Sequence, residues 1–493
     1  MPGHDTKARA DRERLRSLGA GEDSGWHQVR PPPWTNVSTI TRNQPAVPLP
    51  RAWQVRTRDI VAVLVANGIL IGAMWLRHGG LDELTDPSGW FIATGELTAL
   101  LGGYLALVQL VLMSRSPWLE QVVGMDGLAV AHRWVGFACV WLIVAHVLLT
   151  TIGFALADGQ NVIVEAWTLL TTYEFMLMAG VSLLLFIGVA VSSVRMARRH
   201  LAYETWHGLH LYAYLAIALG LGHELVTGSD FAHDPLAWAY WVGLYVVAAA
   251  MIVVFRFVEP FRVSLRHRFR VVNVEREGPG VVSIYLGGRD LDQFPIRAGQ
   301  FVIVRFLAWD GWWRGHPYSI SAAPNGRWLR LTVKDLGEDS TSLASLAIGT
   351  RVYLEGPYGL LTGARRLRRR VLLIAGGIGI APLRALFEEL PAGPGDLTLL
   401  YRASRPRDVV FRDELDQLAR ARNAVVHYLI GARGSRAMPA DPLSPAALER
   451  LVPDLRRREV YLCGPTPMME AVRDGLRAAR VPRGQIHLER FEF

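Results

Sequence analysis

The chain has 493 residues, of which 51% are hydrophobic, and it contains two cysteines. It is too apolar for an ordinary soluble protein and too long for one domain, so we expect a membrane part joined to soluble domains. The formal net charge of +9 does not indicate a nucleic-acid partner, because basic residues of membrane proteins gather in cytoplasmic loops. Two cysteines exclude a disulfide framework and a cysteine-ligated cluster.

Residues 1–55 mix charged residues, proline and glycine without apolar periodicity, which predicts a disordered cytoplasmic tail. The next apolar run begins too late for a cleaved signal peptide, so it is expected to stay in the membrane. Six stretches are long enough to cross a hydrocarbon core of about 30 Å. They lie near residues 58–77, 91–114, 130–157, 172–195, 203–226 and 235–257. Together they predict a six-helix transmembrane bundle over residues 56–258.

The charges of the loops predict how this bundle lies in the lipid bilayer. Arginines accumulate before the first span and after the second, fourth and sixth spans, whereas the other three loops are acidic. Because basic loops are retained on the cytoplasmic side, both termini are expected in the cytoplasm of a multi-pass protein of the cell (inner) membrane.

Four histidines lie in the third and fifth spans. His132 and His146 are 14 residues apart, and His210 and His223 are 13 apart. At about 1.5 Å per residue, each spacing separates two imidazoles by roughly 20 Å along a helix. Both spans run outward, so His132 shares the inner level with His210 and His146 shares the outer level with His223. A lone intramembrane histidine is more often a helix contact, but two matched pairs predict two stacked haems.

The fifth span raises a difficulty for this pairing. Fourteen residues leave a rotation of about 40° on an ideal helix, whereas thirteen leave about 140°. We therefore expect a local distortion in the fifth span, which Gly208, Gly220 and Gly222 could permit. His207 remains an alternative inner ligand to His210.

Residues 262–366 alternate short strands and turns, which predicts a small antiparallel β-barrel. One strand carries HPYSIS, residues 316–321, and a later turn carries VKDLGEDSTSL.

From residue 368 to 493 the pattern is that of an α/β domain. There a buried strand runs into a turn with Gly376, Gly377 and Gly379, and Pro382 follows at the start of a helix. Such a turn admits a phosphate at the helix N-terminus, so it predicts nucleotide binding. A second turn, LCGP, contains Cys463, Gly464 and Pro465.

The order of these motifs resembles the ferric reductase and NADPH oxidase superfamily, with a ferredoxin-reductase-like dehydrogenase fused to the membrane domain. The resemblance covers roughly residues 56–493 and rests on the histidine spacing, HPYSIS, GGIGIAP and LCGP. It implies FAD, two b-type haems and a pyridine nucleotide as cofactors. The resemblance makes the barrel the FAD-binding domain and the α/β domain the NAD(P)-binding domain.

The resemblance also implies roles for single residues. Tyr318 should pack on the isoalloxazine, Ser319 should reach its reactive nitrogen, and Phe493 should stack on the flavin until nicotinamide enters. Cys463 should lie beside the site of hydride transfer, near Glu489. The remaining flavin contacts implied are His316, Pro317, Ser321, Lys334, Ser340 and Thr341, with Thr341 near the pyrophosphate.

The nucleotide is expected to be NADPH, with NADH as the alternative. Arg402, Ser404 and Arg405 follow a predicted strand and suit a ribose 2′-phosphate, although such residues also occur in solvated turns.

The resulting hypothesis is electron transfer from NADPH through FAD and both haems to an acceptor outside, with dioxygen reduced to superoxide. A ferric chelate is the alternative acceptor, because Thr150 stands where the animal oxidases have a second histidine. A haem-binding membrane sensor or transporter is the alternative from another class. No obligatory protein partner is expected.

Overall fold

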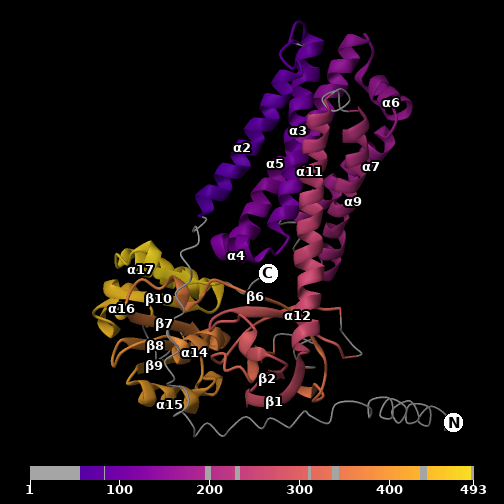
Figure 1. The fold of residues 1–493 in the computed structure, drawn as a ribbon. Coiled ribbons are helices and arrows are strands. Elements are labelled where there is room, and N and C mark those ends of the chain that lie inside the picture. The colour runs from indigo at the N-terminus through magenta and orange to yellow at the C-terminus, as the bar shows by residue number, and fades with distance from the viewer. Residues whose placement is uncertain are drawn as a thin grey trace, which may run out of the picture.

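The computed structural model describes residues 56–82, 84–194, 201, 203–227, 234–308, 313–335, 343–432 and 441–489. A bundle of long helices stands on one side of a β-barrel, and an α/β domain lies beside the barrel (Figure 1). The predicted fold class, a transmembrane bundle followed by a barrel and an α/β domain, is confirmed.

Six helices of the described chain are long and apolar enough to cross a membrane. They are α2 (Thr57–Arg77), α3 (Pro87–Leu112), α5 (Met125–Ala157), α7 (Met176–Ser193), α9 (Tyr203–Thr227) and α11 (Pro235–Val253), and α4 (Pro117–Val123) and α6 (Val162–Thr172) are shorter. The starts of α3 and α11 follow from local chemistry. Asp86 accepts a hydrogen bond from the Gly89 amide, Asp234 accepts from the amides of Leu236 and Ala237, and proline follows each cap.

The last helix of the bundle extends further than the sequence predicted. A π-helical turn (Val254–Val258) follows α11 and leads into α12 (Glu259–His267), which ends two residues before strand β1. The span is therefore one helical run, Pro235–His267, that leaves the membrane and reaches the barrel (Figure 1).

The helices pack in two close pairs, α3 along α5 and α7 along α9. Glycines allow the first pair to approach. A Cβ atom at Gly153 of α5 would lie 2.6 Å from Ile92 Cγ1 and 2.9 Å from the Ile92 backbone nitrogen on α3. Small residues at such a contact let two backbones come within van der Waals distance.

The distortion expected in the fifth span is absent, because α9 is a continuous α-helix from Tyr203 to Thr227. This prediction was wrong because it assumed that the side chains of both histidines project from the same side of the helix. A histidine side chain turns about two bonds, and these rotations orient each ring independently of the helix.

The barrel consists of two three-stranded antiparallel sheets, β1-β2-β5 and β4-β3-β6. The strands are β1 (Arg270–Gly278), β2 (Val281–Gly287), β3 (Phe301–Phe306), β4 (His316–Ser319), β5 (Trp328–Lys334) and β6 (Val352–Tyr358). Single bridges, Ile320 to Leu331 and Arg270 to Arg351, join the two sheets on both sides. Closing the sheet in this way removes its free edges.

The α/β domain has a five-stranded parallel sheet in the order β11-β10-β7-β8-β9. Its strands are β7 (Arg370–Gly376), β8 (Leu397–Ala403), β9 (Val425–Ile430), β10 (Arg458–Cys463) and β11 (Ile486–Leu488), and its helices are α14 (Ile380–Glu389), α15 (Arg412–Arg422), α16 (Pro445–Leu451) and α17 (Thr466–Ala478). The central strands β7 and β10 are buried along almost their whole length, as expected for a parallel sheet covered on both faces.

The close contact of α3 and α5 predicts that Gly153→Val destabilises the bundle. The added methyl groups meet the Ile92 backbone, which cannot move aside, so the stability should fall by about 2 kcal/mol. The measurement is the thermal unfolding midpoint in detergent. Gly188→Val on α7 is the matched control, because a Cβ atom there meets nothing within 4 Å. Equal midpoints for the two variants would contradict the packing argument.

Candidate functional site

The four histidines predicted as metal ligands meet in two pairs. The ring centroids of His132 and His210 are 5.8 Å apart, with planes at 66°. Those of His146 and His223 are 6.3 Å apart, with planes at 44°. One ring of each pair comes from α5 and the other from α9. The structure thus brings together the same two pairs that the spacing predicted.

Three of these rings have a hydrogen-bond partner at Nδ1. His146 Nδ1 lies 3.0 Å from the Gly95 carbonyl, which can only accept, so the proton is on Nδ1. His223 Nδ1 lies 2.9 Å from Thr227 Oγ1, whose own proton is donated to the His223 carbonyl. His210 Nδ1 lies 3.3 Å from Ser193 Oγ. Such partners hold a ring in one tautomer and leave Nε2 free to ligate.

His132 differs from the other three rings, because its Nδ1 is buried without a hydrogen-bond partner. Its main chain is held instead, since Gln109 on α3 donates from Nε2 to the His132 carbonyl at 2.9 Å. The alternative inner ligand His207 is exposed and lies one turn before His210 on α9. The ring opposite His132 is that of His210.

These residues fit a haem better than a bare metal ion. No group of three or more His, Cys, Asp or Glu that could hold a metal occurs in the described ranges, whereas a haem iron needs only two axial ligands from the protein. A metal-to-imidazole bond is about 2 Å, so the centroid separations leave room for an iron between the rings.

The flavin motif forms strand β4. This strand runs antiparallel to β3, with His316 opposite Val304 and Tyr318 opposite Val302. The rings of His316 and Tyr318 are stacked with centroids 6.0 Å apart, and Pro317 lies between these residues in the chain. Ser319 is buried at the end of the strand. This strand therefore presents an aromatic pair on one face of the barrel.

The other residues predicted to contact the flavin are not part of strand β4. Ser321 is fully buried, and its hydroxyl lies 2.6 Å from Thr332 Oγ1 and accepts from Arg330 Nε at 3.0 Å. Lys334 is exposed at the end of β5. Ser340, Thr341 and Phe493 lie outside the described residues.

The predicted nucleotide turn lies at the carboxyl end of β7, beside the equivalent turn after β10. Gly376, Gly377 and Gly379 lead into α14, with Pro382 in its first turn. A Cβ atom at Gly464 would lie 3.0 Å from the Gly376 Cα, and one at Gly376 would lie 3.0 Å from Pro465 Cδ. The two turns therefore touch through their backbones. Ligands of parallel α/β sheets bind at this edge, at the carboxyl ends of the strands.

The residues expected at the ribose phosphate have different surroundings. Arg402 donates to the carbonyls of Ala403, Leu429 and Gly431, so its guanidinium holds the loop after β9. Ser404 and Arg405 are exposed beyond the end of β8. The exposed pair, unlike Arg402, can approach a ligand without breaking contacts within the protein.

Cys463 ends strand β10 and is fully buried. Burial, followed by the neighbouring Glu489 carboxylate, raises the pKa of the thiol well above its usual value. Glu489 is itself buried, its Oε2 has no hydrogen-bond partner, and burial raises its pKa well above the usual range. Cys463 and Glu489 are thus buried neighbours whose ionised forms are both disfavoured by burial.

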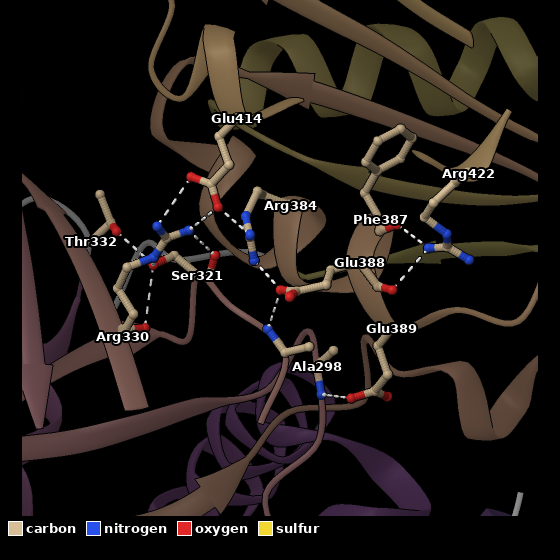
Figure 2. Close-up of polar contacts among 11 residues, drawn as sticks. Ala298, Ser321, Arg330, Thr332, Arg384, Phe387, Glu388, Glu389, Glu414 and Arg422 are labelled. Atoms are coloured by element: carbon tan, nitrogen blue, oxygen red, sulfur yellow. Dashed lines mark hydrogen bonds and ion pairs between the residues drawn. The ribbon is translucent and has the colours of Figure 1, made fainter. Parts of the chain in front are cut away.

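A buried ionic network, which sequence analysis did not identify, joins the barrel to the α/β domain. Glu414 of α15 lies between Arg330 of β5 and Arg384 of α14, and it pairs with both (Figure 2). Arg384 also pairs with Glu388, which accepts from the Ala323 amide at 2.8 Å. Because breaking one buried pair leaves an uncompensated charge, this network resists relative movement of the two domains.

Comparison with known protein families matches three consecutive parts of the chain. Residues 98–221 match the ferric reductase like transmembrane component, residues 267–362 an FAD-binding domain, and residues 373–474 the oxidoreductase NAD-binding domain. The first match contains His132, His146 and His210, and the second contains β4. These are the parts that geometry had already singled out.

Similar proteins share less than half of this chain. The glycine betaine monooxygenase reductase subunit of Chromohalobacter salexigens is 30% identical over 240 residues, which are 46% of this chain and 64% of that protein. The ferredoxin reductase component of 3-ketosteroid-9-alpha-monooxygenase from Mycobacterium tuberculosis is 33% identical over 235 residues, 45% of this chain and 63% of that protein. The chain therefore spans just under two thirds of these relatives. The FAD/NAD-binding domain of nitric oxide dioxygenase from Vibrio cholerae is 23% identical, with a TM-score of 0.36 over 45% of this chain and 98% of that one.

The fold and the matched families define the class of this chain. In it, a ferric reductase-like transmembrane component is fused to an FAD-binding domain and an oxidoreductase NAD-binding domain.

The burial of Cys463 predicts that its thiol resists alkylation in the folded protein. At about pH 8 an ordinary thiol is partly ionised, but Cys463 should stay protonated and inaccessible. Iodoacetamide labelling followed by mass spectrometry should find Cys463 modified only after denaturation. Ala478→Cys provides an exposed control thiol on α17 of the same domain. Labelling of native Cys463 as fast as this control would contradict the prediction.

Proposed function

We propose that this chain transfers electrons from cytoplasmic NADPH across the membrane to dioxygen, which becomes superoxide outside. The observation that carries the proposal is the pair of histidine contacts at two depths between α5 and α9. When bound, FAD would accept a hydride from NADPH and release two electrons and one proton, and two b-type haems would pass each electron to one dioxygen.

The histidine residues would hold the irons through Nε2. The Gly95 carbonyl, Thr227 and Ser193 fix three rings through Nδ1, while Gln109 holds the main chain of His132. With two protein ligands on each iron, no position is left for a substrate, so the outer acceptor would react at the haem edge.

The soluble residues would orient the flavin and the nucleotide. Tyr318 would pack on the isoalloxazine, with Ser319 near its reactive nitrogen and His316 toward its phosphates. The backbone of a dinucleotide would approach Gly377, where a Cβ atom would meet nothing within 4 Å, and Cys463 would lie beside the nicotinamide. Arg405 and Ser404 favour NADPH, since both are exposed where a 2′-phosphate would lie.

The orientation of the chain follows from charge. The barrel and the α/β domain adjoin the end of the bundle that carries Arg115, Arg256 and Arg262. Basic residues remain on the cytoplasmic side, so both soluble domains would lie in the cytoplasm, where NADPH is available.

A ferric chelate is the second candidate acceptor, and one contact favours it. Thr150 stands one turn beyond His146, and its hydroxyl donates to the His146 carbonyl at 2.8 Å. The hydroxyl is thus engaged within its own helix, which leaves the outer face without a dedicated polar group for dioxygen at this position.

Haem content should identify the ligands. His146→Ala and His210→Ala should each lower the haem content from about two per chain to about one, because the loss of one of two axial ligands weakens the binding of that haem. His207→Ala should keep both haems. The measurement is the pyridine haemochrome assay on purified protein with equal flavin content. Loss of haem from His207→Ala and not from His210→Ala would reverse the assignment of the inner ligand.

The acceptor is tested in proteoliposomes with NADPH supplied to the soluble domains. Superoxide formation should be sensitive to superoxide dismutase on the opposite side and should decrease when a ferric chelate competes there. Spectra recorded after NADPH addition should show haem reduction that requires FAD. Ferric reduction without superoxide would establish the second candidate, and unreduced haems would favour a sensor over either enzyme.

A further inference from the structure

Glu355 is a buried carboxylate at the junction of the barrel and the membrane bundle. It lies on β6, and its side chain is 4% exposed. Its Oε2 pairs with Arg115, in the loop between α3 and α4, and its Oε1 pairs with Arg305 on β3. One carboxylate thus bridges two arginines that belong to different domains.

Arg115 is held in an unusual backbone conformation. Its φ of +63° lies in the left-handed region, which costs a residue with a side chain about 1 kcal/mol or more. The flanking residues Ser114 and Ser116 are fully buried. Just before them, the Met113 carbonyl accepts from Arg256 Nη1 of the π-helical turn at 3.2 Å. The surrounding contacts therefore fix the position from which Arg115 reaches Glu355.

Arg305 connects Glu355 to the strand that carries the flavin motif. It lies on β3, which pairs with β4. Its guanidinium lies 5.6 Å from the centre of the Tyr353 ring, and a Cβ atom at Gly315, next to His316, would be 3.1 Å from the guanidinium carbon. The ion pair between Glu355 and Arg305 therefore lies next to the start of β4.

On the membrane side, the same junction leads to the inner histidine pair. Met125, the first residue of α5, packs on Phe301 and Ile303 of β3 and on Tyr358 of β6. His132 lies two turns further along α5. The helix of an inner ligand therefore rests directly on the strands next to the flavin motif.

A second set of hydrogen bonds connects the soluble part to helix α4 of the bundle. The Gly359 amide donates to Glu120 Oε1 of α4 at 2.5 Å, and Arg365 donates to the carbonyls of Gln121 and Val122. Burial raises the pKa of Glu120 to about 7. The ion pairs with arginines at this junction are made by Glu355, which pairs with both Arg115 and Arg305.

Stability alone does not account for a buried ion pair at this position. The desolvation of buried charges offsets most of their attraction, so an apolar contact would join the domains as firmly. A bridged carboxylate differs from an apolar contact in that its hydrogen bonds fix direction and distance.

We propose that Glu355 is a positioning residue that fixes the flavin strand β4 beneath the inner pair His132 and His210, and so determines the rate of electron transfer between them. The inference rests on the proposed function. With FAD and haem bound, the step concerned would be the transfer of one electron from the reduced flavin to the iron held by these histidines. Two such transfers would reoxidise the flavin and release one proton.

The test uses the full-length, haem-loaded protein and the variant Glu355→Gln. Anaerobic stopped-flow mixing with NADPH follows flavin reduction and haem reduction separately. Flavin reduction should stay within about twofold, whereas haem reduction should slow by clearly more than this limit, because electron transfer becomes slower as the distance between donor and acceptor increases. Hydrogen exchange should increase in residues 114–124 and 355–362.

Three further variants provide the comparisons. Arg115→Lys keeps the charge but loses the fork geometry, so it should slow haem reduction even if Glu355→Gln does not fold. Glu414→Gln removes the buried bridge between the barrel and the α/β domain, and it should slow flavin reduction instead. Glu259→Gln, in an exposed pair with Arg262 on α12, should change neither rate.

The outcomes separate this inference from the proposed function. Wild-type protein whose haems are not reduced by NADPH would refute the proposed function. Wild-type haem reduction that is unchanged in both Glu355→Gln and Arg115→Lys would refute the role of Glu355. Equal slowing of flavin and haem reduction in these variants would also refute it, since Glu355 would then support the barrel as a whole.

Discussion

The two histidine pairs depend on the separation of α5 and α9, which contribute one ring each to both pairs. Each of these helices packs along a different neighbour, α5 along α3 and α9 along α7. The glycines of α3 and α5 bring the first pair so close that a single added methyl group would meet backbone. The histidine rings of α5 and α9 meet in two pairs with centroids 5.8 Å and 6.3 Å apart. This separation suits two iron-to-nitrogen bonds of about 2 Å each together with the distance from each bonded nitrogen to the centre of its ring.

The soluble part uses a different kind of contact. The barrel core is apolar, but both of its domain junctions contain a buried carboxylate between two arginines: Glu355 toward the membrane and Glu414 toward the nucleotide domain. Apolar surfaces can slide over one another with little change in energy, whereas paired charges define one arrangement. Under the proposed function, the junction at Glu355 would act on electron transfer toward the membrane, and the junction at Glu414 would act on hydride transfer to the flavin.

Much of this arrangement could be predicted from the sequence, because it depends on periodicity and spacing. Hydropathy located the spans, and the intervals between His132, His146, His210 and His223 defined their pairs. The partners of these rings could not be predicted, since the azimuth of a side chain depends on packing between distant helices. The ion pair of Glu414 could not be predicted either, because Glu414 is 84 residues from Arg330 and its helix has the sequence of a solvent-exposed helix. For Arg402 the sequence suggested a contact with the nucleotide, whereas in the structure its side chain donates to backbone carbonyls.

The helical run Pro235–His267 has a mechanical consequence. At about 1.5 Å per residue, its 33 residues extend roughly 50 Å, well beyond a hydrocarbon core of about 30 Å. It enters β1 after only two residues, one of which, Phe269, is anchored in the barrel core. The barrel is therefore the fixed end of the soluble module, attached to the bundle by a stiff rod rather than a flexible linker. The distance across the membrane junction is therefore set by the helical run and by the barrel core that receives it, and the buried network of Glu414 holds the α/β domain against the same barrel.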